Sequence, residues 1–160
     1  GGPPVSDGLS APAFPSGVRG TPVEINESVA PLLFWRKEYL PDSGGSGRYR
    51  GGLGQVIEIE NAIGQDMELL AAFDRIDFPA RGRAGGADGA AGRVALKQNG
   101  ELQGKGCQQI PAGDRLIINT PGGGGFGPAP QRDRQLVRRD LANGLISHQA
   151  AVGDYALTDG

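Results

Sequence analysis

Alternating apolar and polar residues predict β-structure over most of this chain. The clearest pattern is residues 55–60 (QVIEIE), where Val and Ile alternate with polar residues. Residues 31–40 (PLLFWRKEYL) begin apolar and then alternate, which favours a partly exposed strand over the competing helix. Weaker patterns predict strands at 22–26, 67–73, 93–98 and 114–119, with 101–105 returning after a turn at Asn99-Gly100.

The end of the chain carries helix signals instead. Asp133 is a candidate N-cap before RQLVRRDLAN, and Gly144 stands where that helix would stop. Ser147 is a second candidate N-cap, before the short segment HQAAVGDYA. We therefore predict a mainly β, loop-rich fold, a sandwich or barrel-like sheet, closed by two short C-terminal helices.

Glycine and proline divide the predicted fold into parts. The 160 residues include 29 Gly and 12 Pro, and residues 79–92 form a Gly/Ala-rich loop. A chain of this length suits one domain, residues 1–160. Within it we predict four parts: a loose lead-in (1–13), a β-rich body (14–121), a Gly/Pro loop (122–130) and a helical end (131–157).

Charge and composition exclude several classes of protein. The net charge is −2, so nothing global points to nucleic acid, and the apolar runs are too short to span a bilayer. A single cysteine, Cys107, excludes an internal disulfide framework, and no secretory leader is visible, so we expect a cytoplasmic protein. The chain begins Gly-Gly, and we expect a processed or excised piece, or the tail of a longer protein.

Three motifs were tested against known chemistry and rejected. The pattern Gly122-x-Gly124-x-x-Gly127 fits a dinucleotide fingerprint, but Pro128 and Pro130 follow where a helix should start. Gly104-Lys105 lacks the glycine and hydroxyl spacing of a phosphate loop. The arginines around 132–139 are separated by acids, which favours a solvated helix over a DNA reader.

The single Cys107 and the single His148 set limits on active-site chemistry. A Cys–His nucleophile pair requires the two residues to meet in space, which the sequence does not show. One His and one Cys cannot build a zinc site; a hard-cation site of Asp and Glu oxygens stays open, although no loop has calcium-binding spacing. We expect no metal site in this chain. An independent small enzyme that uses Cys107 remains a third hypothesis.

The most unusual segment is residues 14–55, which combines dense charge of both signs, clustered glycines and the only Trp. Its charged groups suit either internal salt bridges or the wall of a ligand site. Here the sequence resembles the C-terminal part of the hydantoinase B/5-oxoprolinase family, in FPSGVRGTPVEINE and then PLLFWRKEYLPDSGGSGRYRGGLGQ. TPGGGGFG, RDRQLVRRDLANG and LISHQAAVGDY follow in the family's order. Gly20 and the ending ALTDG depart from the family pattern.

The resemblance implies a piece of a B-type component in a cytoplasmic, ATP-dependent machine. ATP would be bound by an A-type part, and the divalent metal by the larger remainder of the B part. The fragment itself would bind no cofactor and have no activity alone. Its partners would be the remainder of the B part, the A-type subunit or domain, and a cyclic amide substrate such as a hydantoin, 5-oxoproline or a lactam.

Ten residues are the candidates for substrate or interface contact. The arginines would hold carboxylate or phosphate oxygens bidentately, and the glycines would offer backbone N–H groups to an oxyanion. The candidates are Arg19, Glu24, Glu27, Arg36, Asp42, Arg48, Gly122, Gly123, Gly124 and Gly125. The alternative function is a non-catalytic docking module of a related ATP-dependent ketone carboxylase.

Overall fold

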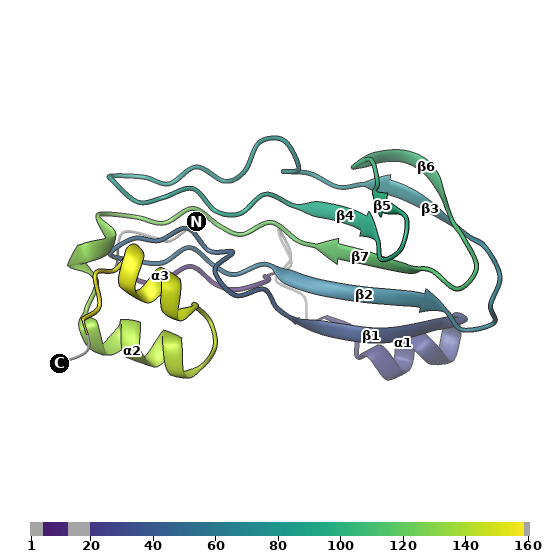
Figure 1. Ribbon diagram of the computed structural model, residues 1–160, viewed down its shortest axis with the longest axis horizontal. Coiled ribbons are helices and arrows are strands. Elements are labelled where there is room, and N and C mark those ends of the chain that lie inside the picture. The colour runs from purple at the N-terminus through teal and green to yellow at the C-terminus, as the bar shows by residue number, and fades with distance from the viewer. Residues whose placement is uncertain (1–4, 13–19, 159–160) are drawn as a thin grey trace.

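The two ends of the molecule have different structures (Figure 1). The computed structural model describes residues 5–12 and 20–158. Strands occupy one end, and the C-terminal helices α2 (Arg134–Ala142) and α3 (His148–Gly153) occupy the other. Between them run long segments without regular secondary structure, side by side in the view of Figure 1. The sheets, the helices and the irregular segments therefore each present a different kind of surface.

The strands form two antiparallel sheets. β3 (Met67–Ala72) pairs with β6 (Lys105–Ile110) in the smaller sheet. The larger sheet has the order β1-β2-β7-β4-β5. Its strands are β1 (Leu32–Tyr39), β2 (Gln55–Asn61), β7 (Arg115–Asn119), β4 (Arg93–Leu96) and β5 (Gly100–Glu101). The prediction of a mainly β fold with two short C-terminal helices is confirmed.

The sheets enclose an apolar core because successive side chains of a strand point to opposite faces. Val94 and Leu96 of β4, with Leu116 of β7, point inward and meet Ile110 of β6. Leu69 of β3 packs against the same cluster. The opposite face of the larger sheet carries polar and charged side chains, as expected for an antiparallel sheet with one solvated side.

Two strand predictions are wrong. Residues 22–26 begin a helix, α1 (Val23–Val29), because Pro22 at the N-cap has a φ of −55° that suits a helix start. Of the strand predicted over residues 101–105, only Glu101 lies in β5 (Gly100–Glu101). Residues 105–110 form β6 instead, a strand fixed by pairing with β3 rather than by its own polar pattern. The other predicted strands are present.

The irregular segments form what we call the glycine layer, residues 43–54, 80–92 and 121–127. Segment 121–127 lies in the middle and is hydrogen bonded to both others. Gly45 N–H donates to Gly123 O at 2.9 Å, and Gly122 N–H donates to Ala90 O at 3.0 Å. A β-carbon on Gly122 would lie 1.7 Å from Ser43 O, so only glycine permits this approach. Backbone therefore packs directly against backbone.

The lead-in predicted to be loose is held in its described part. Gly8 N–H donates to Arg50 O and Ala11 N–H to Leu53 O, both at 2.8 Å. The Asp7 carboxylate accepts from Arg50 N–H at 2.8 Å. These hydrogen bonds fasten the described N-terminal segment to segment 43–54 of the glycine layer.

The helical end follows its sequence signals. Asp133 accepts from Gln135 N–H at 2.7 Å, and Ser147 accepts from Ala150 N–H at 3.1 Å. Gly144 adopts a φ of +66° where α2 stops. A short 3-10 turn, η1 (Ala129–Gln131), leads into this end. A second apolar cluster forms here, separate from the core between the sheets, and contains Ala129, Val137, Ile146, Ala151, Tyr155 and Leu157.

Candidate functional site

The sequence-predicted site residues do not gather in one place. Arg19 lies outside the described residues. Glu24 is exposed on α1, and Glu27 accepts from Phe34 N–H at 2.8 Å, which covers the edge of β1 at that point. Asp42 lies at the other end of the molecule and accepts from Ser147 N–H at 2.8 Å. Glu27 and Asp42 therefore both anchor local structure.

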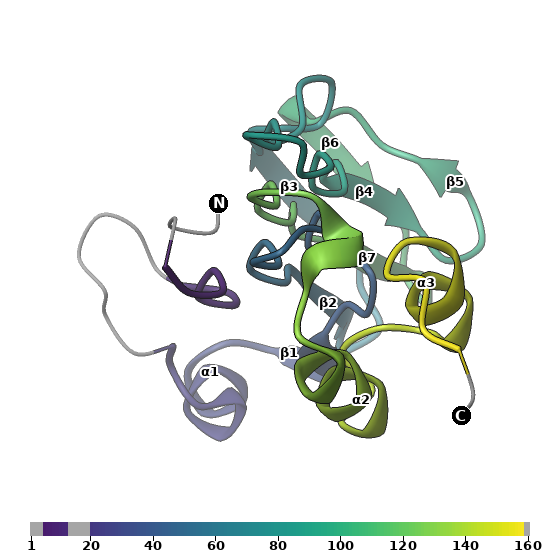
Figure 2. The ribbon, with the colours of Figure 1, turned by 90° about the vertical axis from the view of Figure 1, so that its left-hand side faces the viewer.

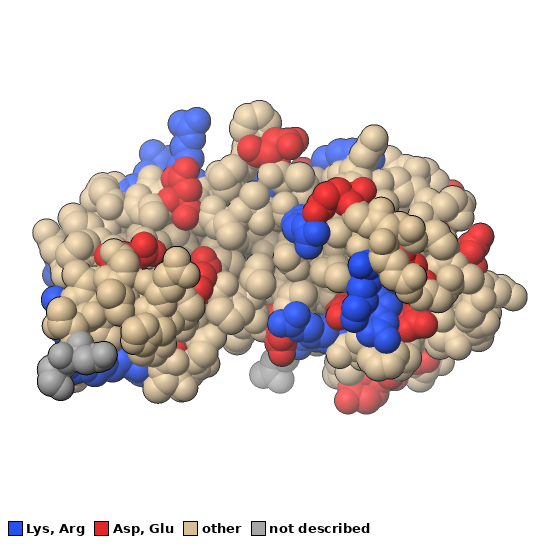
Figure 3. Space-filling model, in the orientation of Figure 1, with Lys and Arg blue, Asp and Glu red and all other residues tan. Residues whose placement is uncertain are grey.

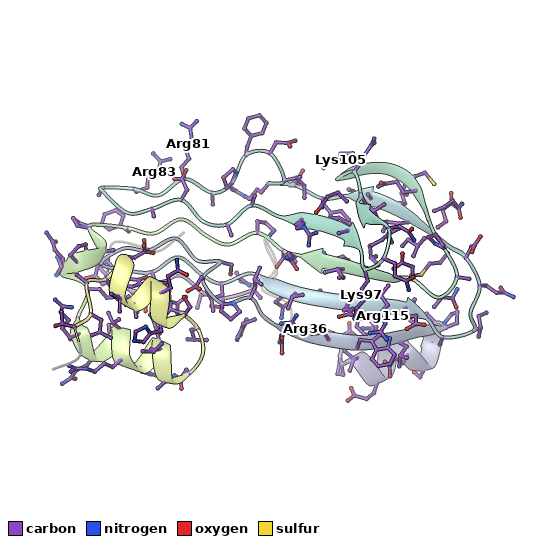
Figure 4. The ribbon with its side chains drawn as sticks, viewed as in Figure 1. Arg36, Arg81, Arg83, Lys97, Lys105 and Arg115 are labelled. Atoms are coloured by element: carbon purple, nitrogen blue, oxygen red, sulfur yellow. The ribbon has the colours of Figure 1, made fainter. Side chains whose placement is uncertain are left out.

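Arg36 belongs to a charged surface on the outer face of the larger sheet. A register shift between Phe34 and Arg36 places Arg36 opposite Glu58, on the same face as Trp35. Arg36 pairs with Glu38, and Trp35 Nε1 donates to Glu60 at 2.7 Å. Figure 3 shows blue and red side chains interspersed on this part of the surface, and Figure 4 shows Arg36, Lys97 and Arg115 there.

Arg115 connects this surface across the strands. Its guanidinium donates to Glu58 at 2.9 Å and Glu60 at 3.1 Å, and its Cζ lies 3.6 Å from the centre of the Trp35 ring. Lys97 donates to Glu58 at 2.9 Å. These hydrogen bonds hold the pKa of the Glu58 carboxyl below its usual value. The charges neutralise one another, so this face is a solvated sheet surface rather than an ion-binding site.

The Gly122–Gly125 segment lies in the middle of the glycine layer. The N–H groups of Gly122, Gly123 and Gly125 donate to Ala90 O, Gly52 O and Ala87 O, at 2.8–3.0 Å. The role expected from the sequence, an oxyanion site built from these N–H groups, is therefore not available to these three. The glycines serve instead to pack backbone against backbone.

An open hollow of about 460 Å³ lies beside the glycine layer. We call it the arginine hollow. Three arginines line it, Arg75, Arg81 and Arg83, and Gly124 is the one sequence-predicted residue in its lining. The complete lining is Arg75, Phe78, Pro79, Ala80, Arg81, Arg83 and Gly124. Figure 4 shows Arg81 and Arg83 projecting outward together from the upper edge of the molecule.

Sequence reasoning missed these three arginines. The segment F-P-A-R-G-R carries two arginines separated by one glycine, beside an exposed phenylalanine. That pattern was available as a signal, but it stood inside what looked like a featureless Gly/Ala loop. Arg75 contributes from before the loop, and its φ of +59° is unusual for a residue with a side chain.

A neighbouring hollow of about 540 Å³ shares Arg75 and Phe78 with the arginine hollow. Its charges are mixed, since Asp74 and Asp77 line it along with Lys105. Lys105 pairs with Asp74 at 2.7 Å and lowers the pKa of that carboxyl. The two hollows form adjacent depressions of different charge.

A buried ionic cluster joins three parts of the chain. The Arg132 guanidinium, fully buried, donates to both oxygens of Asp7, at 2.6 Å and 2.7 Å, and to Asp140 at 2.8 Å. Arg50 donates to the same Asp140 oxygen at 3.1 Å. Burial raises the pKa of Asp7, but the hydrogen bonds and charge of Arg132 and Arg50 outweigh it and lower the pKa overall. The carboxylates and the two Nη groups of Arg132 pair within the cluster, whereas its buried Nε has no partner in the described part of the chain; the cluster is structural.

Neither Cys107 nor the acidic residues offer a catalytic or metal centre. Cys107 donates to Glu68, and this hydrogen bond raises the pKa of the thiol, which disfavours the nucleophilic thiolate. Within residues 5–12 and 20–158, no three His, Cys, Asp or Glu side chains lie close enough together to hold a metal ion. The described residues thus do not fit the divalent metal implied for the whole enzyme. No described helix is both long and apolar enough to cross a membrane.

Comparisons with known proteins agree on one family. A sequence model described as hydantoinase B/oxoprolinase matches residues 1–129. The caprolactamase subunit beta of Pseudomonas jessenii is 31% identical over 144 residues, covering 84% of this chain and 24% of its own length. An uncharacterised protein of Methanocaldococcus jannaschii is 36% identical over 138 residues, with the same two coverages. The 5-oxoprolinase 1 of Arabidopsis thaliana is 40% identical over 113 residues, covering 68% of this chain and 9% of its own.

Solved structures give the same result. The ATP-dependent caprolactamase of Pseudomonas jessenii superposes with a TM-score of 0.74 at 25% identity, over 90% of this chain and 26% of that one. A nucleotide-free acetone carboxylase shares the fold, with a TM-score of 0.70 at 24% identity over 97% of this chain and 25% of that one. This chain therefore spans about a quarter of each of these longer chains. It belongs to the hydantoinase B/oxoprolinase family.

Proposed function

We propose that this domain is the C-terminal part of the B component of a cytoplasmic, ATP-dependent hydrolase that opens the C–N bond of a cyclic amide. In this role it completes one wall of the active site and contacts the remainder of the B component and the A-type part. The chemistry and the ATP site belong to those other parts. Similarity to a caprolactamase subunit and to 5-oxoprolinases supports the reaction class.

The observation that carries the proposal is the exposed edge at β1. This strand lies at the end of the larger sheet and no further strand pairs with its outer edge among the described residues, although the Glu27 side chain accepts from Phe34 N–H there. Trp35 is 51% exposed and Tyr39 49% exposed, and Val29 of the adjacent α1 is 79% exposed. Aromatic side chains at this density are typical of protein–protein contacts. The occupant we propose is the remainder of the B component.

The glycine layer supplies the wall. Its segments approach so closely that backbone atoms replace side chains in the packing, which makes the layer stiff. The arginine hollow opens beside it. No step of the proposed reaction is assigned to a metal held by this domain.

The test uses full-length B component with its A-type partner. Trp35→Ala and Tyr39→Ala probe the β1 edge, and Arg48→Ala and Arg83→Ala probe the layer and its hollow. If the edge is an interface, Trp35→Ala weakens assembly by roughly 2 kcal/mol, about thirtyfold in affinity. Normal assembly and turnover in all four variants would contradict the proposal.

A docking-only role is the second candidate, and the same open edge favours it. The two roles differ in the Arg48 and Arg83 variants. If these variants assemble normally but turn over cyclic amide more slowly, the domain contributes to the active-site wall. If only the edge variants matter, and only through assembly, the domain docks subunits without touching substrate.

A further inference from the structure

We infer that the arginine hollow is a binding site for a small organic anion that carries a carboxylate or phosphate group next to an apolar body. Nothing in the family relationship assigns a ligand to Arg75, Arg81 or Arg83. The inference does not depend on the proposed function, because it concerns binding by this chain itself.

The lining of the hollow is positively charged, and Asp74 beside Arg75 offsets only part of that charge. Its lining contains three arginines and no acidic residue. Within the described part of the chain, none of the three guanidinium groups makes an ion pair, whereas Arg36, Arg50, Arg93, Arg115 and Arg132 all do.

The nearest acidic residues along the chain have other contacts. Asp74 pairs with Lys105 at 2.7 Å, and Asp88 accepts from Gly82 N–H at 2.7 Å. Asp77 lines the neighbouring hollow and is not in the lining of this one. In a chain with a net charge of −2, a lining that contains three arginines and no acidic residue is a local excess of positive charge. An anion from outside the described chain would neutralise it.

The backbone beneath these arginines is fixed. Arg83 N–H donates to Gly125 O at 2.9 Å, and Gly127 N–H donates to Arg83 O at 3.0 Å, so Arg83 is tied on both sides to the glycine layer. Arg75 O accepts from Gly92 N–H at 2.8 Å. Arg75 also keeps a φ of +59°, a conformation that is strained for a residue with a Cβ. The attachment points are thus held in place before any ligand arrives.

The side-chain types select the ligand. A guanidinium presents paired N–H donors that match two oxygens of a carboxylate or phosphate. Phe78 stands beside the arginines with 83% of its surface exposed, which leaves its ring free to cover an apolar group. A hollow of about 460 Å³ accommodates a small molecule rather than a polymer. Because the hollow is open to solvent, we expect weak, millimolar affinity.

The test is a calorimetric titration of the chain with four probes: inorganic phosphate, phenyl phosphate, benzoate and benzylammonium. Phenyl phosphate and benzoate should saturate, phosphate should bind more weakly, and the cation should not bind. The variant Arg81→Gln/Arg83→Gln should weaken phenyl phosphate binding about tenfold. Phe78→Ala should abolish the advantage of phenyl phosphate over phosphate. Arg138→Gln, an exposed arginine on α2, is the matched control and should bind like the wild type.

Arg75→Gly separates binding from folding. It removes a guanidinium at a position whose φ favours glycine, so the melting temperature should stay unchanged while binding weakens. Equal affinity in the wild type, the double variant and Arg138→Gln would overturn the inference, and so would equal binding of benzylammonium. Absence of saturation by any anion would overturn it too, even if an acidic protein segment were found on this surface. Loss of turnover or assembly bears on the proposed function alone.

Discussion

Replacing Gly122 with alanine should break the glycine layer. The new methyl group would lie 1.7 Å from Ser43 O, whereas an ordinary contact begins at 3.4 Å, so the two backbone segments must separate by about 1.7 Å. Two hydrogen bonds join these segments next to the substitution, Gly45 to Gly123 and Gly123 to Gly52, and Gly122 itself donates to Ala90 of the third segment, at 2.8–3.0 Å. Each bond contributes about 1 kcal/mol, and a buried group left without a partner costs more. We expect a loss of about 4 kcal/mol in the free energy of unfolding.

A loss of this size is a large part of the 5–15 kcal/mol typical of a domain and corresponds to a fall of about 10 °C in melting temperature. The assay is thermal and urea unfolding followed by circular dichroism. Gly153→Ala is the matched control, because nothing lies within 4 Å of its Cβ position and it sits in helix α3. This control should be neutral or stabilising by up to about 1 kcal/mol. A Gly122→Ala protein as stable as the control would refute the backbone-packing account.

Three further predictions concern the titratable groups. In the folded state the pKa of Asp7 is lowered from 3.8. Its contribution to stability is therefore complete above that value and is lost as the pH falls through the folded pKa. Asp7→Asn should remove this part of the pH dependence when urea unfolding midpoints are measured in acid. The Glu68 hydrogen bond raises the pKa of Cys107, so Glu68→Gln should increase the rate of thiol alkylation severalfold, and an unchanged rate would count against that bond. Burial raises the pKa of Tyr155 to about 12, and its hydroxyl has no partner among the described residues. Tyr155→Phe should therefore remove the tyrosinate absorbance step that occurs at the highest pH and leave the free energy of unfolding within about 1 kcal/mol of the wild type. A larger loss of stability would show that the hydroxyl has a partner.

Local signals in the sequence were sufficient for most of the strands and for the N-caps of the two C-terminal helices. The alternation in residues 55–60, the N-cap Asp133 and the stop at Gly144 each depend on interactions within a few residues. A short stretch of sequence is therefore enough to predict them. β6 was missed because its residues are mostly polar, and its structure comes from pairing with β3 forty residues away. α1 was mistaken for a strand because its few apolar residues alternate and are not buried.

The candidate site was harder to predict because it depends on contacts between distant segments. Arg81 and Arg83 are exposed loop residues in the sequence, and only the folded chain brings Arg75, Phe78 and Gly124 beside them. The glycines in TPGGGGFG were expected to offer N–H groups to an oxyanion, but what approaches Gly122 is another stretch of backbone, at Ser43 O. Which group approaches a glycine cannot be read from the glycine itself.

The buried ionic cluster explains how the glycine layer is secured. The two apolar clusters lie at the ends of the molecule, between the sheets and around the C-terminal helices, and the layer between them consists largely of backbone against backbone. Such a layer gains little from burying apolar side chains, so it depends on hydrogen bonds and on what fastens it to its neighbours. Arg132 and Asp140 come from the helical end, Arg50 from the layer and Asp7 from the N-terminal segment. Because removing one member leaves buried charge unpaired, loss of Arg132 would weaken the attachment of the helical end and the N-terminal segment to the glycine layer.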